Sequence, residues 1–375
     1  MTRIFLIRHA EAEGNIFRRA HGHFNGQIIG RGFEQIDRLK ARFEHEKFDA
    51  VYSSDLSRTR VTASAIYVPH NLPLNTTSRL REVNMGEWED KAWGDIEHDD
   101  PEMNRNFSMD PERWHVSGSE GFHHTQTRIR DCVLEIAGQH DSGTVAVISH
   151  GFAIRSFISG LLGIRSDEIK KVTYFDNTAV TLLLCENGEL SISYQGDNSH
   201  LSSESSTFAN QTWWRSKNER VTENSRFLQL DETRDLALLE QIREETGKKH
   251  GAGEQYVAFL GDEPAGVIGL DTASYTTDGM VGQGGWQDGG ISSAEAGNIG
   301  WIDYIYVRPE LRRRNYGIQL IGQAVSVFRK LKCEKTRVIV SHDNPAIGFF
   351  ERFDFTKIGD SDSGYIMEKN IRNWE

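Results

Sequence analysis

Two short apolar runs, each followed directly by a histidine, constrain the fold of this chain more than any other feature. Residues 4–7 lead into Arg8 and His9, and residues 145–148 lead through a serine into His150. Continuous apolar runs of this length are typical of buried parallel strands. Ligands bind beyond the carboxyl ends of such strands, so we expect both histidines in one site of an α/β domain.

The length of 375 residues indicates two domains. The segment 197–211 is rich in Ser, Asn and Thr and is the most linker-like part of the chain. We therefore predict a first domain at 1–205, a linker at 206–225 and a second domain at 226–375. In the first domain, helices are expected at 33–46 and 126–138.

The second half has its own alternation of strands and helices. Strands are expected at 226–230, 301–307 and 336–341, helices at 231–246 and 318–331, and a hairpin that turns at 261–264. A glycine-rich loop is expected at 279–290. The halves share no internal repeat, which indicates two unrelated α/β domains.

Composition excludes several classes of protein. A net charge of −12 argues against general nucleic-acid binding, which needs a basic face. No apolar stretch approaches the length of a membrane span, and the first residues are charged too early for a signal peptide. The three cysteines are far apart and form no C-x-x-C motif, as expected for reduced thiols in a cytoplasmic protein.

The residues after the first strand suggest phosphoryl transfer. A neutral imidazole is nucleophilic near pH 7 and can accept a phosphoryl group. The transferred group also needs cationic donors around its oxygens, and the planar guanidinium groups of Arg8 and Arg58 suit that task.

Residues 1–205 resemble the histidine phosphatase, or phosphoglycerate-mutase-like, superfamily. The blocks that carry the resemblance occur in order: LIRHAEAEGN, GHFNGQIIGRGFEQ, SSDLSRTRVTA, LREVNMGEWED, GSEG, ISHG and DNSHL. Ala10 and Asp90 stand where glycine is usual, Asn25 where aspartate is usual, and Gly121 where serine is usual. The resemblance implies a three-layer α/β/α domain.

The resemblance also implies a role for each site residue. His9 attacks phosphorus, and Glu82 protonates the departing alkoxide and then activates water. Such an acid needs a raised pKa at neutral pH. The phosphate pocket is lined by Arg8, Asn15, Arg58 and His150. This chemistry requires no metal, and the sequence has no metal-ligand spacing of the H-E-x-x-H kind.

The same superfamily contains phosphatases and mutases. The residues after the histidine motif, IFRRAHGHFNG, fit the phosphatase-like pattern better. We therefore expect hydrolysis, with a phosphoglycerate-mutase-type transfer as the alternative.

A second constellation follows the strand at 301–307. The sequence IYVRPELRRRNYGIQLI gives a strand, a proline-containing turn and the start of a helix, whose first amides form an anion cradle. Residues 226–370 resemble the GNAT acetyltransferase superfamily, whose Arg/Gln-x-x-Gly-x-Gly/Ala signature corresponds to residues 312–317. Asn315 stands where glycine is usual, and asparagine tolerates left-handed backbone angles.

The sequence DNPAIGFFERFDF resembles a second GNAT block and includes Asn344. It has Phe350 in the place of a tyrosine that often protonates the departing thiolate, and Asp354 in the place of a glycine. Acid catalysis by that tyrosine is therefore not available, whereas direct attack of a neutral amine on the thioester remains.

The implied ligand of the second domain is acetyl-CoA. The residues implied to bind it are Ile305, Tyr306, Val307, Arg312, Arg313, Arg314, Asn315, Tyr316, Gly317 and Asn344. The candidates for accepting the amine proton or binding the acceptor are Asp303, Tyr304 and Tyr306.

Together these features predict a bifunctional enzyme that acts on small molecules, a phosphate ester and an amine, and not on nucleic acids or membranes. Both activities could address one metabolite that bears a phosphate and an amine. The alternatives are a phosphatase with an inactive, CoA-sensing GNAT domain, a mutase fused to an acetyltransferase, and a scaffold in which neither site turns over.

Overall fold

The computed structural model describes residues 1–212, 214–215, 223–246, 253–271 and 299–372. These residues form two compact units: most of those up to 215 belong to the first, and those from 223 onward belong to the second. The glycine-rich stretch 279–290 lies outside the described residues.

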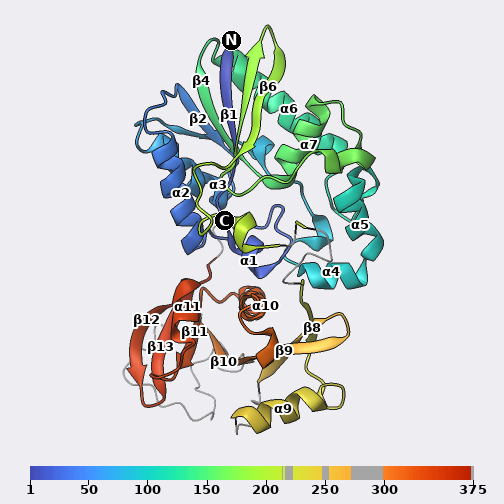
Figure 1. Cartoon of the computed structure of the whole chain (residues 1–375), viewed down its shortest axis with the longest axis vertical. Helices are drawn as coiled ribbons and strands as arrows, with labels where there is room; N and C mark the ends of the chain where they lie inside the picture. The colour runs from blue at the N-terminus through green and yellow to red at the C-terminus, as the bar shows by residue number, and fades with distance from the viewer. Residues whose placement is uncertain (213, 216–222, 247–252, 272–298, 373–375) are drawn as a thin grey trace. The chain divides into compact units, whose positions relative to one another are not determined.

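The first unit is built on a sheet in the order β3-β2-β4-β1-β5-β6 (Figure 1). β1 pairs with β4 in parallel and with β5 in antiparallel orientation. Its strands are β1 (Thr2–Arg8), β2 (Ala50–Ser53), β3 (Leu74–Thr76), β4 (Thr144–Ser149), β5 (Val180–Glu186) and β6 (Glu189–Asp197).

The helices in this part of the chain are α1 (Glu13–Phe17), α2 (Gly30–Arg42), α3 (Ser57–Tyr67), α4 (Trp93–Asp99), α5 (Pro101–Met109), α6 (Phe122–Gln139), α7 (Gly151–Leu161) and α8 (Thr207–Asn210). Short 3₁₀ segments occur at Ser78–Leu80, Gly86–Trp88, Pro111–Arg113 and Ser166–Lys171. The predicted helices at 33–46 and 126–138 correspond to α2 and α6, each with somewhat different ends.

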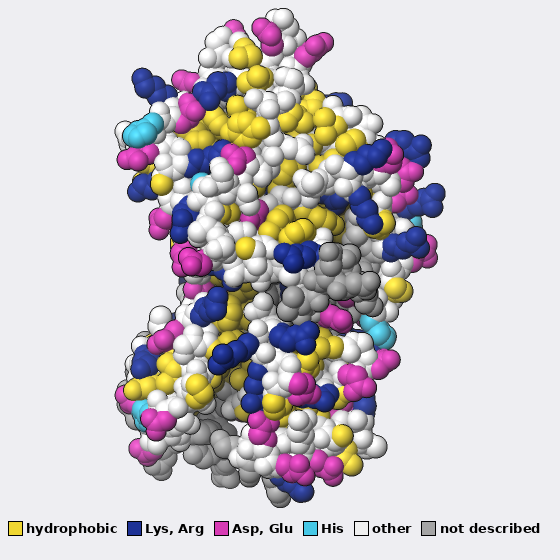
Figure 2. Space-filling view, viewed as in Figure 1, with side chains coloured by type: hydrophobic (Ala, Val, Ile, Leu, Met, Phe, Trp, Pro, Cys, Tyr) yellow, Lys and Arg dark blue, Asp and Glu magenta, His cyan; other side chains and the backbone are white. Residues whose placement is uncertain are grey.

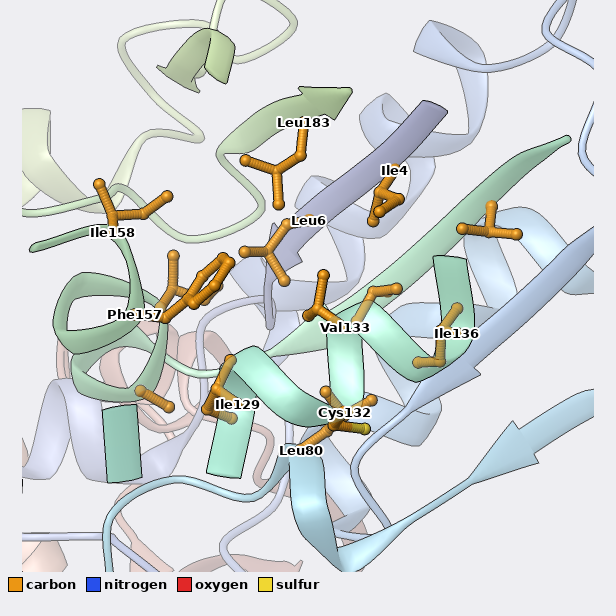
Figure 3. Packing of buried hydrophobic residues seen from close by; sticks show 14 of the residues in the cluster. Ile4, Leu6, Leu80, Ile129, Cys132, Val133, Ile136, Phe157, Ile158 and Leu183 are labelled. Atoms are coloured by element: carbon orange, nitrogen blue, oxygen red, sulfur yellow. The ribbon is translucent and has the colours of Figure 1, made fainter. Parts of the chain in front are cut away.

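Alternation along β1 creates the three layers, because successive side chains of a strand point to opposite faces of the sheet. Ile4 and Leu6 pack with residues of α6 and α7, as Figure 3 shows. Phe5 and Ile7 pack with residues of α2 and α3 on the other face. The strand is therefore covered on both sides, which is why its sequence is apolar without a break.

The segment 197–211, whose composition is linker-like, is packed into the first unit. Ser205 and Thr207 are buried, and their polar groups bond to Gln35. Here the abundance of serine reflects buried hydrogen bonding. The boundary proposed at 206–225 stays a prediction.

The second unit contains a sheet in the order β12-β13-β11-β10-β9-β8-β7. The strands are β7 (Arg226–Gln229), β8 (Glu254–Leu260), β9 (Glu263–Asp271), β10 (Ile299–Val307), β11 (Lys335–Val340), β12 (Thr356–Ser361) and β13 (Gly364–Asn370). The helices are α9 (Leu236–Thr246), α10 (Tyr316–Lys330) and α11 (Ile347–Arg352), and a 3₁₀ turn spans Pro309–Leu311.

The start of α9 differs from the prediction. The sequence suggests a helix from Asp231, but the helix begins at Leu236. The carboxylate of Asp231 accepts hydrogen bonds from the backbone N–H groups of Thr233 and Arg234. It therefore stabilises a separate turn, in the way aspartate commonly does outside helices.

Charged side chains are mixed on the surface. On the face shown in Figure 2, Lys and Arg alternate with Asp and Glu over the described residues and do not merge into a field of one sign. Within the described ranges, every helix is either too short or too polar to cross a bilayer.

Candidate active sites

The first candidate site lies where β1 and β4 end side by side. Arg8 is in register with Ser149, so the next residues of the two strands, His9 and His150, are neighbours. Their ring centroids are 5.2 Å apart, and both side chains are buried. The structure thus brings together the two histidines that the sequence places after separate strands.

The orientation of the His9 ring determines which nitrogen can react. Its Nδ1 lies 2.7 Å from the carbonyl oxygen of Ala10. A carbonyl only accepts, so Nδ1 carries the proton and the lone pair is on Nε2. Burial lowers the pKa of His9 well below its usual value, and the charges of Arg58 and Arg8 lower it further, so the ring is neutral at pH 7.

Arg58 comes from the first turn of α3 and is buried. Its two terminal nitrogens donate to the carbonyls of Gly22 at 2.7 Å and Phe24 at 2.8 Å. Burial lowers its pKa to about 10, which leaves the guanidinium charged at neutral pH. Its position is therefore fixed by the backbone of the 22–24 loop.

His150 is also held as a neutral ring. Its Nδ1 accepts from Nε of Arg58 at 3.2 Å, so its proton is on Nε2, which donates to Oγ of Ser54 at 2.8 Å. Burial is the main cause that lowers its pKa well below the usual value, followed by the charge of Arg58. The ring therefore faces His9 without adding a third positive charge.

Arg8 contributes a second buried guanidinium. One of its terminal nitrogens donates to the carbonyl of Phe175, whereas its Nε has no hydrogen-bond partner among the described atoms. The residue beside it is Gly151, where an added Cβ would lie 3.1 Å from that Nε. Glycine at this position therefore permits the close approach of Arg8 to the start of α7.

The carboxyl group of Glu82 lies at the N-terminus of α7. Its Oε1 accepts from the backbone N–H groups of Val83 at 3.1 Å and Ala153 at 2.7 Å, and its Oε2 accepts from Phe152 at 3.0 Å. These bonds lower its pKa, but burial outweighs them and the net shift is upward. A raised pKa is what a general acid needs near neutral pH.

Aromatic rings pack around Phe152, which supplies one of these amides. Phe152, whose amide bonds to Glu82, stacks on Phe107 of α5 with ring centroids 4.7 Å apart. Trp114 contacts both rings, and Trp88 contacts Phe107 and Trp114. The start of α7, which supplies amides to Glu82, is thus anchored in an aromatic cluster.

Asn15 was expected to assist in the phosphate pocket. The structure places it in α1, where its Oδ1 accepts from the backbone N–H of Ala12 at 3.0 Å. Its side-chain oxygen therefore stabilises the turn that follows His9, and a role at the phosphate stays a prediction.

The sequence did not suggest a role for Glu89. Its carboxylate accepts from the backbone N–H groups of Gly22, His23, Phe24 and Met85 at 2.7–3.2 Å. It therefore holds the loop whose carbonyls fix Arg58. Its place in the LREVNMGEWED block was the available signal, but residue type alone does not reveal such backbone contacts.

The second candidate site lies where β10 separates from β11. The two strands pair in parallel only from Ile299 to Ile302, whereas β10 continues to pair with β9 as far as Val307. A bulge at 302–304 accompanies the change. The end of β10, which includes Ile305 and Val307, thus leaves the ladder with β11.

The turn into α10 adopts the predicted backbone. Asn315 has a φ of 62°, in the left-handed region, and makes no side-chain cap on the helix. The first amides of α10 lack partners within the helix and are therefore suited to an anion. Gly317 lies in this first turn, and the neighbouring Tyr316 has its ring buried.

Side chains near this turn are already paired. Arg312 donates from Nε to the carbonyl of Val307 at 2.9 Å and forms an ion pair with Glu245 at 2.6 Å. Arg314 lies over the ring of Tyr316. The position of Arg313 is marked by a left-handed φ of 59°. The backbone is thus the clearest anion-binding feature here.

The residues of the second GNAT-like block make local contacts, and the expected role of Asn344 at the cofactor stays a prediction. Asn344 caps the turn before α11, with Oδ1 accepting from the Ala346 N–H at 2.9 Å. Phe350 is buried between Phe349 and Phe355. Asp354 has a φ of 67°, the conformation that explains glycine as the usual residue there.

The candidates for proton transfer differ in their pairing. The hydroxyl groups of Tyr304 and Tyr306 donate to Gln255 and Glu245, respectively. Burial raises the pKa of Tyr304 and raises that of Tyr306 to about 12, so both stay protonated at neutral pH. Burial and the nearby Asp271 raise the pKa of Asp303.

The described ranges contain no group of three or more His, Cys, Asp or Glu side chains arranged to hold a metal ion.

Two curated proteins and one solved structure illustrate what the first domain is similar to in sequence. Phosphoserine phosphatase 1 of Hydrogenobacter thermophilus is 30% identical over 164 residues, which are 44% of this chain and 78% of that protein. Adenosylcobalamin/alpha-ribazole phosphatase of Salmonella typhimurium is 27% identical over 160 residues, 43% of this chain and 79% of that protein. The solved structure of Bacillus stearothermophilus YhfR is 27% identical with a TM-score of 0.52, and the match covers 54% of this chain and all of that one.

Family comparison assigns both halves. Residues 4–198 match the histidine phosphatase superfamily (branch 1), and residues 212–355 match the acetyltransferase (GNAT) family. The predicted fusion is confirmed, and the chain belongs to the histidine phosphatase superfamily and carries a GNAT acetyltransferase domain behind the phosphatase domain.

Proposed function

We propose that the first domain hydrolyses phosphate monoesters through a phosphohistidine formed on His9. The orientation of His9 carries this proposal. Its Nδ1–H is committed to the Ala10 carbonyl, so Nε2 is the atom able to attack phosphorus. The buried guanidinium groups of Arg8 and Arg58 provide fixed positive charge for the phosphoryl oxygens.

In the first half-reaction, Nε2 of His9 forms a bond to phosphorus while the bond from phosphorus to the ester oxygen breaks. The departing oxygen takes the proton of Glu82. In the second half, Glu82 accepts a proton from water, whose oxygen attacks the phosphohistidine and releases inorganic phosphate. His9 and the protonated Glu82 are thereby restored.

The hydrogen bonds of Glu82 suit it to this role. A carboxylate has about four acceptor positions, and three of them accept backbone N–H groups. The remaining position is on Oε2, because Oε1 already accepts two bonds. A single proton therefore has one place on the group, and the raised pKa favours its presence.

The test is a brief exposure to a labelled phosphate ester, followed by acid and base treatment of the protein. An acid-labile, base-stable label on His9, with inorganic phosphate equal to substrate consumed and no effect of a chelator, supports the proposal. An isomerised phosphoester as the main product would instead indicate the mutase. A chelator-sensitive rate would contradict the mechanism.

For the second domain we propose acyl transfer from acetyl-CoA to an amine. The end of β10 and the uncapped start of α10 provide backbone groups for the pantetheine and pyrophosphate portions. Acetyl-CoA would supply the acyl group. Tyr304 and Tyr306 retain their protons, which favours Asp303 as the acceptor of the amine proton.

We further propose that both domains act on one class of metabolite that carries a phosphate and an amine. The relative named phosphoserine phosphatase supports this class, since phosphoserine has both groups. A metabolite screen that reads phosphate release and CoA release on one library tests it. Tight CoA binding without turnover on any amine would favour the sensor, and disjoint substrate sets would reject a shared metabolite.

A further inference from the structure

Residues 198–211, which we call the strap, follow β6 and are built into the first unit. The match to the phosphatase family ends at residue 198, and the GNAT match begins at residue 212. Despite its linker-like composition, the strap has buried residues at 205–207. It makes two sets of hydrogen bonds to the segments around His9.

The first set passes through Asp176. This buried carboxylate accepts from Oγ of Ser206 at 2.6 Å and from Nδ2 of Asn198 at 3.0 Å on one oxygen. Its other oxygen accepts from the backbone N–H of Phe208 at 3.3 Å. The next residue, Asn177, donates from Nδ2 to the carbonyl of His9 at 2.8 Å. The strap thus supports the turn that holds the nucleophile's backbone.

The second set reaches Glu11, two residues after His9. Gln211 donates from Nε2 to Oε1 of Glu11 at 2.7 Å. Gln35 donates from Nε2 to the carbonyl of Ser205 at 2.8 Å and accepts from the backbone N–H of Glu11 at 2.7 Å. The backbone on both sides of the Ala10 carbonyl, which orients the His9 ring, is therefore tied to the strap.

These contacts cannot be lost without consequence, because Glu11, Gln35, Asp176 and Asn177 are all buried. A buried polar group without its partner is costly, so the segments would shift to find new partners. Arg58 is held differently: its terminal nitrogens bond to the carbonyls of Gly22 and Phe24, outside the strap. Loosening the strap should therefore move the nucleophile more than the phosphate-binding guanidinium.

We propose that the strap is a positioning element of the phosphatase site, which sets the orientation of His9 for attack. The inference rests on the proposed phosphohistidine chemistry. The catalytic unit then extends beyond the family match, to residue 211. The serine-rich segment is thereby part of the enzyme and not only a tether.

The test uses the full chain with Ser206→Ala and Gln211→Ala combined. We expect kcat and the rate of phosphohistidine formation to fall on the order of 10- to 100-fold, because small misplacement of a reacting group is costly. KM and competitive inhibition by inorganic phosphate should change little. If the double variant fails to fold, Gln211→Ala alone gives the same comparison.

Two variants separate positioning from general loosening. Thr2→Val removes a buried hydroxyl that donates to the carbonyl of His140 at 3.0 Å, at the opposite end of β1 from His9, and should retain the wild-type kcat. Ser206→Thr keeps the hydroxyl that Ser206→Ala removes, so it should keep the wild-type rate. An equal loss in Thr2→Val, or a loss confined to KM in the double variant, would overturn the proposal.

A second measurement separates this inference from the proposed function. Nitrogen-15 NMR of His9 should show the Nδ1–H form in the wild type and a mixture of tautomers in the double variant, whether or not any substrate turns over. If the wild type turns over and the double variant has the same rate and the same His9 spectrum, the proposal that the strap positions His9 is wrong. A wild type that forms no phosphohistidine overturns the proposed function, and the His9 spectrum still decides on the strap.

Discussion

Both domains place a helix N-terminus beyond the end of a central strand, but they use it differently. At α7 the first amides bond to the chain's own carboxylate, Glu82. At α10 Asn315 provides no side-chain cap. In the proposed sites, the buried guanidinium groups of the first domain would bind the anion, whereas in the second domain the helix amides would bind it. The N-terminus of a helix thus holds a carboxyl group in the first site, and in the second it is proposed to bind an anion.

The largest expected effect is loss of the nucleophile. His9→Ala should lower phosphate release by about 10⁴-fold or more, the scale found when a nucleophile is removed, and should abolish the labelled intermediate. Binding of CoA should be unchanged, because the residues proposed to bind it lie between Ile305 and Asn344, far along the chain from His9. The measurement is steady-state phosphate release beside titration calorimetry with CoA.

An exposed histidine supplies the control for that comparison. His123 lies on α6 with 64% of its side chain exposed, and His123→Ala should leave phosphate release intact. Retention of wild-type activity in His9→Ala would contradict the proposed mechanism.

The next effect tests what the α7 terminus does. Glu82→Gln should slow cleavage on the order of 10²–10⁴-fold for esters with a poor leaving group, the usual contribution of a general acid. With a nitrophenolate leaving group the loss should shrink, because little protonation is needed. In the wild type, the limb of the pH profile in which activity falls with rising pH should reflect the raised pKa of Glu82.

That limb should disappear in Glu82→Gln. An equal loss on both classes of ester, with the pH profile unchanged, would make Glu82 a structural residue at the helix start and weaken the contrast between the two helices.

A smaller effect is expected at the α10 terminus. Gly317→Pro removes one amide donor, and a hydrogen bond to a charged group contributes about 1.5–3 kcal/mol, so CoA affinity should fall roughly 10- to 100-fold. Asn315→Gly keeps the left-handed conformation and serves as the matched control with retained affinity. Calorimetry with CoA measures both, and unchanged binding in Gly317→Pro would remove the backbone cradle from the proposal.

The smallest effect concerns pH. Burial, followed by the charge of Arg42, lowers the pKa of His200 to about 4, whereas the unfolded chain has an ordinary histidine pKa. Between these values the unfolded chain binds more protons, so stability is lost as the pH falls, by at most about 1.4 kcal/mol per pH unit. Hydrogen exchange in the first domain at pH 7 and pH 5 measures the loss.

His200→Asn should reduce the pH dependence of the first domain without abolishing it, because burial also lowers the pKa values of His9 and His150. An equal acid sensitivity in both domains would show that buried imidazoles do not distinguish them.

The sequence was most informative where local patterns determine structure. The apolar runs before His9 and His150 predicted buried parallel strands that end at one site, and the structure pairs these strands directly. Asn315 was expected to tolerate the left-handed angles that it adopts. The sequence could not indicate which residues, distant in the chain, form hydrogen bonds with one another. The bonds from Glu89 to the 22–24 loop, and from Asp176 to the strap, join polar residues whose types suit a surface equally well.

The same limit explains the linker-like segment and the start of α9. Serine and asparagine are common in tethers because they bond readily to nearby groups, and the same capacity lets them fill buried positions at residues 205–207. Composition alone does not distinguish the two uses. Asp231 shows the related ambiguity, since a carboxylate that can begin a helix can also close a turn.

The Nε of Arg8, which lacks a hydrogen-bond partner among the described atoms, also affects the stability of the protein when no substrate is bound. A buried guanidinium that lacks part of its hydrogen bonding favours any state in which an anion is bound. Inorganic phosphate, the product of the proposed reaction, would then act as a folding ligand as well as an inhibitor. Cells rich in phosphate would hold more of the first domain intact while keeping it less active, so abundance and activity would vary in opposite directions.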